Sequence, residues 1–230
     1  MAVVGLLVAA GSGARLGAGR PKAFVDCAGR ELFQWSLEAL RLSCDRVVVA
    51  VPAGFEGGDP DRVVGRRSRS GSVRAALGAA PEARVAVIHD AARPLVTPGL
   101  VEHCLAALEE GWDGAVAAAR TTDTLKEAGP EDGRIVATVD RARLWAAQTP
   151  QVFRADVLRR ALAVDAATLA AASDDAALVE AAGGTVRVVD APPDNLKVTS
   201  ALDLRVAEAL LRERDGRGRA GAGAEHSTAP

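Results

Sequence analysis

The sequence predicts an α/β fold, in which a mainly parallel sheet is flanked by helices and carries a projecting β-hairpin arm. Three observations support this prediction. Short β-branched runs alternate with longer amphipathic segments along most of the chain, which is typical of βαβ units. The first apolar run leads directly into a glycine-rich loop, and the alternation is interrupted once, at about residues 121–153. Together they indicate one α/β domain with one insertion.

Each predicted strand is a short β-branched run that a turn or loop bounds. The strands are expected at Val3–Val8, Arg46–Val51, Arg62–Val64, Val85–His89, Gly114–Ala119 and Thr185–Val189. Apolar residues at helical spacing and alanine-rich runs predict helices at Glu31–Leu40, Ser72–Ala80, Pro98–Glu110, Arg154–Val164, Asp174–Ala182 and Thr199–Arg214. In open parallel sheets ligands bind at the carboxyl ends of the strands, so the loops after Val8, Val64 and His89 should converge on one crevice.

The segment 121–153 contains the runs TTDTLKE and RIVATVDRARLW on either side of an acidic, glycine-containing turn. This pattern predicts an antiparallel hairpin that stands out from the sheet, and arms of this kind often dock on a partner. Ser200 and Asp203 have the spacing of a capping box at the start of the last helix. Residues 1–214 are therefore interpreted as a single domain, and residues 215–230, which have almost nothing to bury, as a disordered tail.

Composition excludes several classes of protein. The formal net charge of −2 and the pI near 6.0 give no global attraction to nucleic acid or to an anionic membrane. Cys27, Cys44 and Cys104 lie far apart without a C-x-x-C pair, so neither a disulfide framework nor a zinc site is indicated. The apolar N-terminus lacks a basic region and stops at Gly11, and no later apolar run is long enough for a membrane helix. We expect a soluble protein of the reducing cytoplasm.

The stretch LLVAAGSGARLGAGRPK, residues 6–22, is the strongest functional signal. It runs from a strand through Ala9 and Ala10 into a loop with Gly11 and Gly13, and it carries the positive charges of Arg15 and Lys22. Glycine lets backbone N–H groups approach an anion closely, and successive N–H groups in such a turn form an anion-binding concavity. The loop is therefore predicted to cradle a phosphate group; otherwise it is a glycine-rich turn with two solvated cations.

Two familiar glycine loops fit this stretch poorly. A dinucleotide fingerprint would need glycine at Leu16 and an acidic residue near the end of the second strand, where Arg46–Pro52 offers none. A Walker loop needs Gly-Lys-Ser/Thr at its close, whereas Lys22 follows Pro21 and precedes Ala23. The remaining pattern, A-A-G-x-G-x-R-x-G with P-K downstream, is similar to the signature of nucleotidyltransferases that activate sugar or polyol phosphates.

Further motifs follow the glycine loop along the chain. They are RSGSV at 69–73, HDAARP at 89–94, DTLK at 123–126, VDR at 139–141, QTPQ at 148–151 and NLKVT at 195–199. Each is weak evidence alone, but in this order they resemble the 2-C-methyl-D-erythritol 4-phosphate cytidylyltransferases over nearly the whole chain except the tail. The resemblance implies a Rossmann-like nucleotidyltransferase fold, a homodimer, and transfer of CMP from CTP to a polyol phosphate with release of pyrophosphate.

The resemblance assigns the catalytic roles to positive side chains. Arg15 and Lys22 would neutralise charge that grows on the α-phosphate of CTP, since catalysis of such transfers is mainly positioning and charge stabilisation. Their alternative is a pair of surface cations beside a glycine turn.

Similarity to the family assigns Arg141 and Lys197 to positioning the methylerythritol phosphate, with Arg93 and Thr124 helping to bind it. In that family the arm reaches another subunit, so Arg141, Thr124 and Arg93 are expected to complete a neighbour's active site. The alternative for Arg141 is an ion pair within the hairpin, with Asp140 or Asp123.

The resemblance places recognition of cytosine at the backbone around Ala9, Ala10 and Gly65 and at the hydroxyl of Ser72. Buried hydrogen bonds discriminate bases well because a wrong base leaves polar groups unpaired. Here the chain departs from the family pattern: it has Gly65-Arg66 where relatives usually have a Gly-Gly pair, and it has Ser70-Gly71 before Ser72. Arg66 would either narrow the base pocket or point to solvent.

Asp90 is predicted at a strand's carboxyl end, facing the triphosphate, where it would bind the ribose or orient water around Mg²⁺. No dedicated metal cage is visible in the sequence, so Mg²⁺ or a similar divalent ion would be held mainly by the phosphates of CTP. His89 is interpreted as a packed strand-end residue, because a phosphate nucleophile needs no general base. Asp174 and Asp175 fit a helix N-terminus.

Three alternatives stay open at this point. A ribitol-5-phosphate cytidylyltransferase would share these motifs, and the two acceptors differ little. A non-catalytic nucleotide-binding regulator would keep the fold, although the combination of Arg15, Lys22, Arg141 and Lys197 argues against it. A Rossmann oxidoreductase is the most distant alternative, and titration with NAD beside CTP would separate it.

Overall fold

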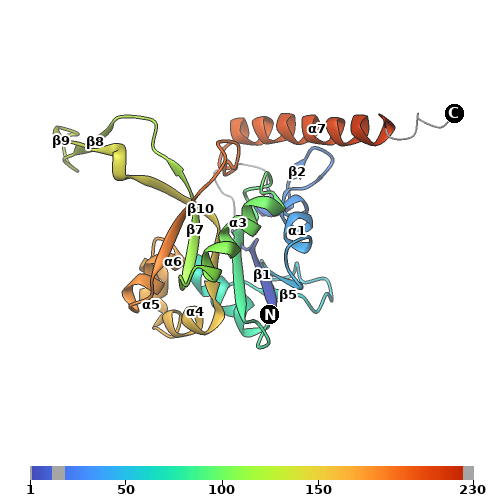
Figure 1. Ribbon diagram of the computed structural model, residues 1–230, viewed down its shortest axis with the longest axis horizontal. Helices are drawn as coiled ribbons and strands as arrows, with labels where there is room; N and C mark the ends of the chain where they lie inside the picture. Colours follow the sequence, from blue (N-terminus) through green and yellow to red (C-terminus); the bar gives the residue numbers. More distant parts are fainter. Residues whose placement is uncertain (1, 12–18, 225–230) are drawn as a thin grey trace.

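The computed structural model describes residues 2–11 and 19–224, with side chains described as far as Asp215. Its centre is a seven-stranded sheet in the order β11-β7-β10-β6-β1-β4-β5 (Figure 1). Every neighbouring pair in it is parallel except the two pairs that β10 makes. The strands are β1 (Val3–Val8), β4 (Arg46–Val51), β5 (Arg62–Val64), β6 (Val85–Asp90), β7 (Gly114–Arg120), β10 (Trp145–Arg154) and β11 (Val186–Asp190). All six predicted strands are confirmed within a residue or so at each end.

The strand β10 was not predicted. The sequence analysis assigned residues as far as 153 to the projecting arm, but the second half of β10 lies inside the sheet, antiparallel to β6 and β7. Val152 and Phe153 there are fully buried. Pro150 conceals this strand in the sequence, because proline cannot donate to a ladder and argues against a central strand. A register shift between Ala147 and Gln151 separates the two halves of β10.

Helices cover both faces of the sheet, as predicted. One core cluster joins α1 (Leu32–Arg41) and α3 (Pro98–Glu109) to alternate strand residues such as Leu7 and Val87. The other joins α2 (Arg69–Gly78), α4 (Ala155–Ala161) and α6 (Asp175–Ala181) to the intervening residues, such as Leu6 and Ile88. Side chains alternate across a strand, so these consecutive apolar residues fill both layers. A further helix, α5 (Ala166–Ala171), was missed; Asp165 caps it.

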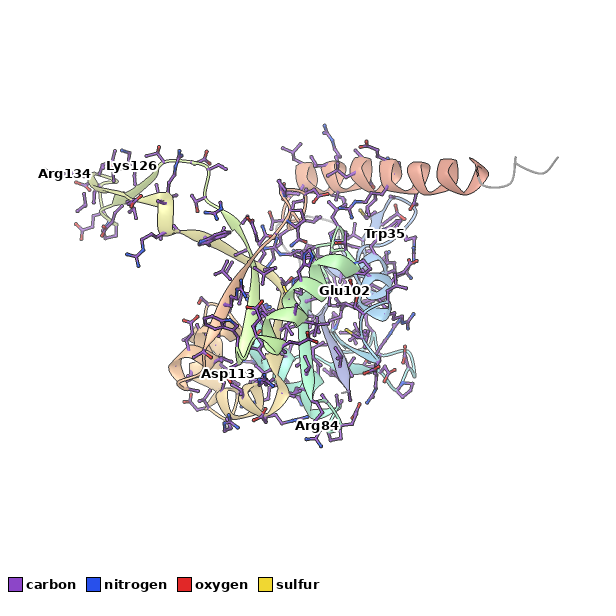
Figure 2. The ribbon with its side chains drawn as sticks, viewed as in Figure 1. Trp35, Arg84, Glu102, Asp113, Lys126 and Arg134 are labelled. Carbon is purple, nitrogen blue, oxygen red and sulfur yellow. The ribbon has the colours of Figure 1, made fainter. Side chains whose placement is uncertain are left out.

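The arm contains a hairpin of β8 (Leu125–Ala128) and β9 (Ile135–Val139), which pair antiparallel only with each other. It stands away from the sheet, as predicted (Figure 1). Lys126 and Arg134 lie on its outer part, whereas Arg84 and Asp113 lie at the opposite end of the molecule (Figure 2). A single-turn helix, η3 (Arg141–Arg143), connects β9 to β10.

The last helix, α7 (Ala201–Ala224), lies at the same end as the arm and extends in the opposite direction (Figure 1). Its predicted capping box is confirmed: the Ser200 N–H donates to Asp203 Oδ2 at 2.8 Å and the Asp203 N–H donates to Ser200 Oγ at 3.2 Å. The helix was expected to end at Arg214, before a disordered tail. Its backbone is helical to Ala224, past the predicted end. Residues 225–230 lie outside the described residues, so the disorder expected of the tail stays a prediction.

Short elements complete the edge of the fold beneath α7. They are η2 (Lys22–Phe24), β2 (Asp26–Cys27) and β3 (Arg30–Glu31). A small apolar cluster that includes Cys27, Leu95, Val198 and Leu211 joins this edge to α7 and to the loop after β6. Segments that are distant in the sequence, at 22, 95 and 198, are therefore fixed relative to one another.

Candidate active site

A cavity of about 470 Å³ lies at the carboxyl ends of the strands. It adjoins the neighbouring strands β1 and β6, between which the strand order reverses direction. Open α/β sheets bind ligands at such a topological switch point. The predicted crevice is thereby confirmed. The described residues that line it are Val8, Ala9, Ala10, Gly11, Lys22, Ala23, Arg66, Arg67, Ser68, Arg69, Ser72, Asp90, Ala91, Ala92 and Lys197.

The chain leaves β1 directly into this cavity. The Ala9 N–H donates to the Ala50 carbonyl at 2.8 Å, so the backbone is held until the loop begins, and Ala10 and Gly11 line the cavity after it. Gly13 and Arg15 fall in residues 12–18, outside the described residues. Their roles in the phosphate cradle remain predictions.

At one end of the cavity the loop after β5 approaches the loop after β1. The Gly65 N–H donates to the Val51 carbonyl at 2.8 Å, and a Cβ at Gly65 would lie only 2.2 Å from Ala10 Cβ. Ser72 Oγ accepts from the Arg66 N–H at 2.9 Å and lies 3.0 Å from the Ser68 carbonyl, which it can donate to. The four residues expected to read cytosine, Ala9, Ala10, Gly65 and Ser72, therefore come together here.

Lys22 and Lys197, which also line the cavity, come from opposite ends of the chain. Lys22 begins η2, and its Nζ donates to the Val198 carbonyl at 2.8 Å. Lys197 Nζ forms an ion pair with Asp90 Oδ2 at 2.6 Å. The segment that carries Lys197 is held against the loop after β6, because the Val198 N–H donates to the Ala92 carbonyl at 2.8 Å. Two predicted cations and the predicted carboxylate thus line one cavity.

Arg69 is the main site residue that the sequence analysis missed as such. It is the first residue of α2, and its guanidinium joins Asp90 Oδ1, at 2.8 Å from Nε, to Asp175 Oδ2, which pairs with Nη1. Asp175 was interpreted only as part of a helix start, yet it is fully buried and serves as the inner anchor of Arg69. Arg69 is the first residue of the RSGSV motif, but only Ser72 of that motif was predicted to lie in the site.

The charges in this cluster alter its acid–base behaviour. Burial alone would raise the pKa of Asp90, but the positive charges of Arg69 and Lys197 hold the pKa well below its usual range. Asp90 is therefore ionised at neutral pH, and because its pKa is so low its carboxylate is too weak a base to take up a proton there. It serves instead to hold two cations, on opposite sides of its carboxylate, at the edge of the cavity.

His89 is a packed strand-end residue, as predicted. It is fully buried; its Nε2 lies 3.1 Å from the Arg93 carbonyl and its Nδ1 lies 3.0 Å from Thr149 Oγ1. The Arg93 carbonyl can only accept, so Nε2 carries the proton of the neutral imidazole. Nδ1 then accepts from the Thr149 hydroxyl, whose oxygen also accepts from the Asp90 N–H at 3.1 Å. Burial lowers the pKa of His89 to about 4. Thr149, which sequence reasoning did not single out, thereby fixes the backbone of Asp90.

Arg93 follows β6 and is buried inside its own subunit. It was expected to help bind the acceptor and to complete a neighbour's site together with arm residues, and both roles stay predictions. Its Nη1 donates to the Asn195 carbonyl at 2.7 Å, and the Asn195 side chain donates to the Thr149 carbonyl at 2.9 Å. The sequence of a loop does not distinguish a buried arginine from an exposed one, so the burial of Arg93 could not be predicted from the sequence. Arg93 therefore joins the loop that follows Asp90 to the separate segment that carries Lys197.

Arg141 and Thr124 lie on the arm, are exposed, and do not line the cavity of their own subunit. Arg141 donates from Nη1 to the Thr122 carbonyl across the base of the arm. Neither proposed aspartate partner of Arg141 is paired with it among the described contacts. Asp174 fits its predicted place at a helix start, since it caps α6 by accepting from the Ala177 N–H at 2.9 Å.

The described residues form neither a cluster of potential metal ligands nor a membrane-spanning helix. No cluster of three or more His, Cys, Asp or Glu side chains that could hold a metal ion occurs among them. None of the helices they form is long and apolar enough to cross a membrane.

The chain resembles known proteins over most of its length. A family model described as 2-C-methyl-D-erythritol 4-phosphate cytidylyltransferase matches residues 3–213. Proteins of that name from Deinococcus radiodurans and Saccharopolyspora erythraea are 46% and 43% identical; each match covers 92% of this chain, and 90% and 100% of those proteins. The crystal structure of the protein of that name from Thermus thermophilus matches with a TM-score of 0.78 and 36% identity, covering 92% of this chain and all of that one. This chain therefore belongs to the 2-C-methyl-D-erythritol 4-phosphate cytidylyltransferase family.

Proposed function

We propose that this enzyme transfers CMP from CTP to 2-C-methyl-D-erythritol 4-phosphate, giving 4-diphosphocytidyl-2-C-methyl-D-erythritol and pyrophosphate, a step of the non-mevalonate isoprenoid pathway. Its family makes it a cytidylyltransferase. The observation that supports the substrate pair best is the cavity at the switch point, where Lys22, Arg69 and Lys197 gather from three separate segments. Two polyanions that must react with each other need such a concentration of positive charge.

In the reaction, an oxygen of the acceptor phosphate attacks the α-phosphorus of CTP and pyrophosphate leaves. The nucleophile is already ionised, so the protein has to align the reactants and neutralise the charge that develops on the α-phosphate. Lys22 lies at the cavity in position for this role, and Arg15 is assigned to it by the family resemblance. Losing one such contact costs on the order of 3 kcal/mol, or roughly a hundredfold in rate.

The acceptor phosphate is proposed to bind at Lys197. The ion pair between Lys197 Nζ and Asp90 Oδ2, at 2.6 Å, fixes the position of this positive charge before the acceptor phosphate binds. Arg141 and Thr124 of a second copy would complete the site, since in their own subunit they are exposed on the arm and away from the cavity. Exposed Ile135 and Val136 on the arm, at 59% and 67%, favour docking of this segment and hence a homodimer.

Mg²⁺ or a similar ion is proposed to accompany CTP. Of the described residues that line the cavity, only Asp90 carries a carboxylate, and both of its oxygens already accept from cations. This donor set fits an ion that the substrate phosphates hold, with Asp90 contacting its water shell, and does not fit a protein cage. The ion would supply further charge neutralisation on the triphosphate.

We also expect the enzyme in a reducing cytoplasm. Cys27, Cys44 and Cys104 are all free. Burial raises the pKa of each thiol to about 12, so these cysteines are inert packing residues.

The test is pyrophosphate release from CTP with 2-C-methyl-D-erythritol 4-phosphate, beside ribitol 5-phosphate and beside ATP, GTP and UTP. We expect release with CTP and the methylerythritol acceptor only. A preference for ribitol 5-phosphate would identify the enzyme as a ribitol-5-phosphate cytidylyltransferase. Binding of CTP without turnover of any acceptor would favour the non-catalytic regulator.

A further inference from the structure

We propose that Arg66 lays its guanidinium over the cytosine ring of CTP and acts as a stacking platform that raises affinity for the nucleotide. The inference rests on the proposed function, because it needs CTP in the cavity with its base at the Gly65 end. It concerns the position at which this chain departs from the family pattern.

The backbone of Arg66 is anchored at the base end of the cavity. Its N–H donates to Ser72 Oγ at 2.9 Å, and the preceding residue, Gly65, lies against Ala10. The root of the Arg66 side chain is therefore fixed beside Gly65 and Ser72, the groups expected to read cytosine.

The second departure from the family pattern lies against the first. A Cβ added at Gly71 would come within 3.1 Å of Arg66 Cβ and 3.7 Å of Arg66 Cγ. The first atoms of the Arg66 side chain therefore lie directly over Gly71, in the first turn of α2, where a larger residue would crowd them. The two unusual residues form one local arrangement that directs Arg66 along the start of α2.

The guanidinium of Arg66 is available to a ligand. The side chain is exposed and lines the cavity, and within the described part of the chain it has no ion-pair or hydrogen-bond partner. Arg69, by contrast, has both of its carboxylate partners and is mostly buried. Arg66 therefore loses no existing bond when it covers a base.

A planar guanidinium stacks well on a flat π system and is weakly hydrated, so it is suited to this role. Stacking uses the face of a base, whereas discrimination uses its edge. Arg66 should therefore raise affinity for CTP and UTP by a similar factor, while the backbone at Gly65 and the hydroxyl of Ser72 keep the preference for cytosine.

The test is titration calorimetry of Arg66→Ala and Arg66→Lys with CTP, UTP and inorganic tripolyphosphate, which lacks a base, in the presence of Mg²⁺. We expect Arg66→Ala to weaken CTP binding about five- to tenfold, with tripolyphosphate binding within twofold of wild type. The ratio of CTP to UTP affinity should stay within twofold. The CTP affinity of Arg66→Lys should be closer to that of Arg66→Ala than to that of wild type, because an ammonium group keeps the positive charge but has no planar face to stack on the base.

Two arginines serve as comparisons. Arg84 precedes β6 at the opposite end of the sheet and controls for the loss of one charge, so Arg84→Ala should match wild type (Figure 2). Arg67 is the exposed neighbour of Arg66 and lines the same cavity, so Arg67→Ala should weaken CTP binding less than Arg66→Ala does. In turnover, Arg66→Ala should raise KM for CTP and leave kcat and the KM for the acceptor within twofold.

Four results would overturn the proposal: unchanged CTP affinity in Arg66→Ala, an equal loss with tripolyphosphate, full recovery in Arg66→Lys, or an equal loss in Arg67→Ala. The second would make Arg66 a phosphate ligand, and the last two would reduce its effect to charge alone. Failure of the proposed function is separate: wild type would then bind CTP in an Arg66-dependent way without forming product from any acceptor.

Discussion

At the scale of single residues, Gly65 shows how closely the base end of the cavity is packed. We expect Gly65→Ala to weaken CTP binding by tenfold or more, because the new methyl group would lie 2.2 Å from Ala10 Cβ and 3.2 Å from Ser72 Oγ. Ala10 cannot easily move, since the adjacent Ala9 N–H is bonded to the Ala50 carbonyl. Calorimetric titration with CTP measures the effect.

Gly78 provides the matched control for that substitution. It lies at the end of α2, and a Cβ there would meet nothing within 4 Å. Gly78→Ala should bind CTP like wild type and unfold at the same or a slightly higher temperature. Normal CTP affinity in Gly65→Ala would show that the close approach of Gly65 to Ala10 does not shape the nucleotide site.

His89 makes stability depend on pH in a defined window. Its pKa is lowered to about 4 by burial, from an ordinary value of 6.5, so between these values the unfolded chain takes up a proton that the folded chain does not. The free energy of unfolding should therefore fall as pH drops from about 6.5 to about 4, by roughly 3 kcal/mol in all. Urea unfolding at several pH values measures this loss.

The variant His89→Gln cannot take up this proton and should flatten the curve in that window. His103→Gln is the control: the His103 side chain is exposed on α3, so this variant should show the same dependence of unfolding free energy on pH as wild type. If His89→Gln kept the full slope between pH 6.5 and 4, the pH dependence would have another origin.

At the scale of elements, the arm should be separable from the nucleotide site. The hairpin β8–β9 pairs only with itself, whereas the cavity belongs to the strands and loops of the body. Replacing residues 128–136, which lie between the paired residues Glu127 and Ala137, by a two-residue Asn-Gly turn should therefore leave CTP affinity within twofold of wild type. It should convert the protein to a monomer and reduce turnover of the acceptor by at least a hundredfold, as followed by light scattering and pyrophosphate release.

The reason is the proposed placement of Arg141 and Thr124 in the partner's site. A shortened variant that stayed dimeric and fully active would place both the subunit contact and the acceptor site elsewhere. Loss of CTP affinity in that variant would instead mean that the arm supports its own subunit's cavity.

At the scale of the whole molecule, the proposed dimer divides each active site between two chains. Lys22→Ala and Arg141→Ala should each be at least a hundredfold less active than wild type when assayed alone. Mixed and allowed to exchange subunits, they should recover up to about a quarter of wild-type activity, because half of the dimers are hybrids with one intact site of two. Pyrophosphate release before and after mixing measures the recovery.

Mixtures of Lys22→Ala with Lys197→Ala form the control. Both residues line the cavity of one subunit, so hybrids contain no intact site and should stay inactive. No recovery from the first mixture, in samples shown to contain hybrid dimers, would mean that Arg141 acts within its own subunit or not at all.

Several features of this protein follow from the sequence alone. Local periodicity gave the strands β1, β4, β5, β6, β7 and β11 and most helices, because consecutive β-branched residues and helical spacing act over a few residues. The motif order predicted the family and identified Lys22, Asp90 and Lys197, which line one cavity, as candidate site residues. Both kinds of signal are local in the chain, so they need no knowledge of which distant segments touch.

The tertiary structure decided what distant segments do to one another. Pairing with β6 and β7 made a central strand of the Pro150 region, against its local preference. Burial placed Arg93 inside the body, and contact with Asp90 and Asp175 made Arg69 part of the site. These outcomes depend on desolvation and on charges that meet only after folding, so residue type and spacing by themselves could not supply them.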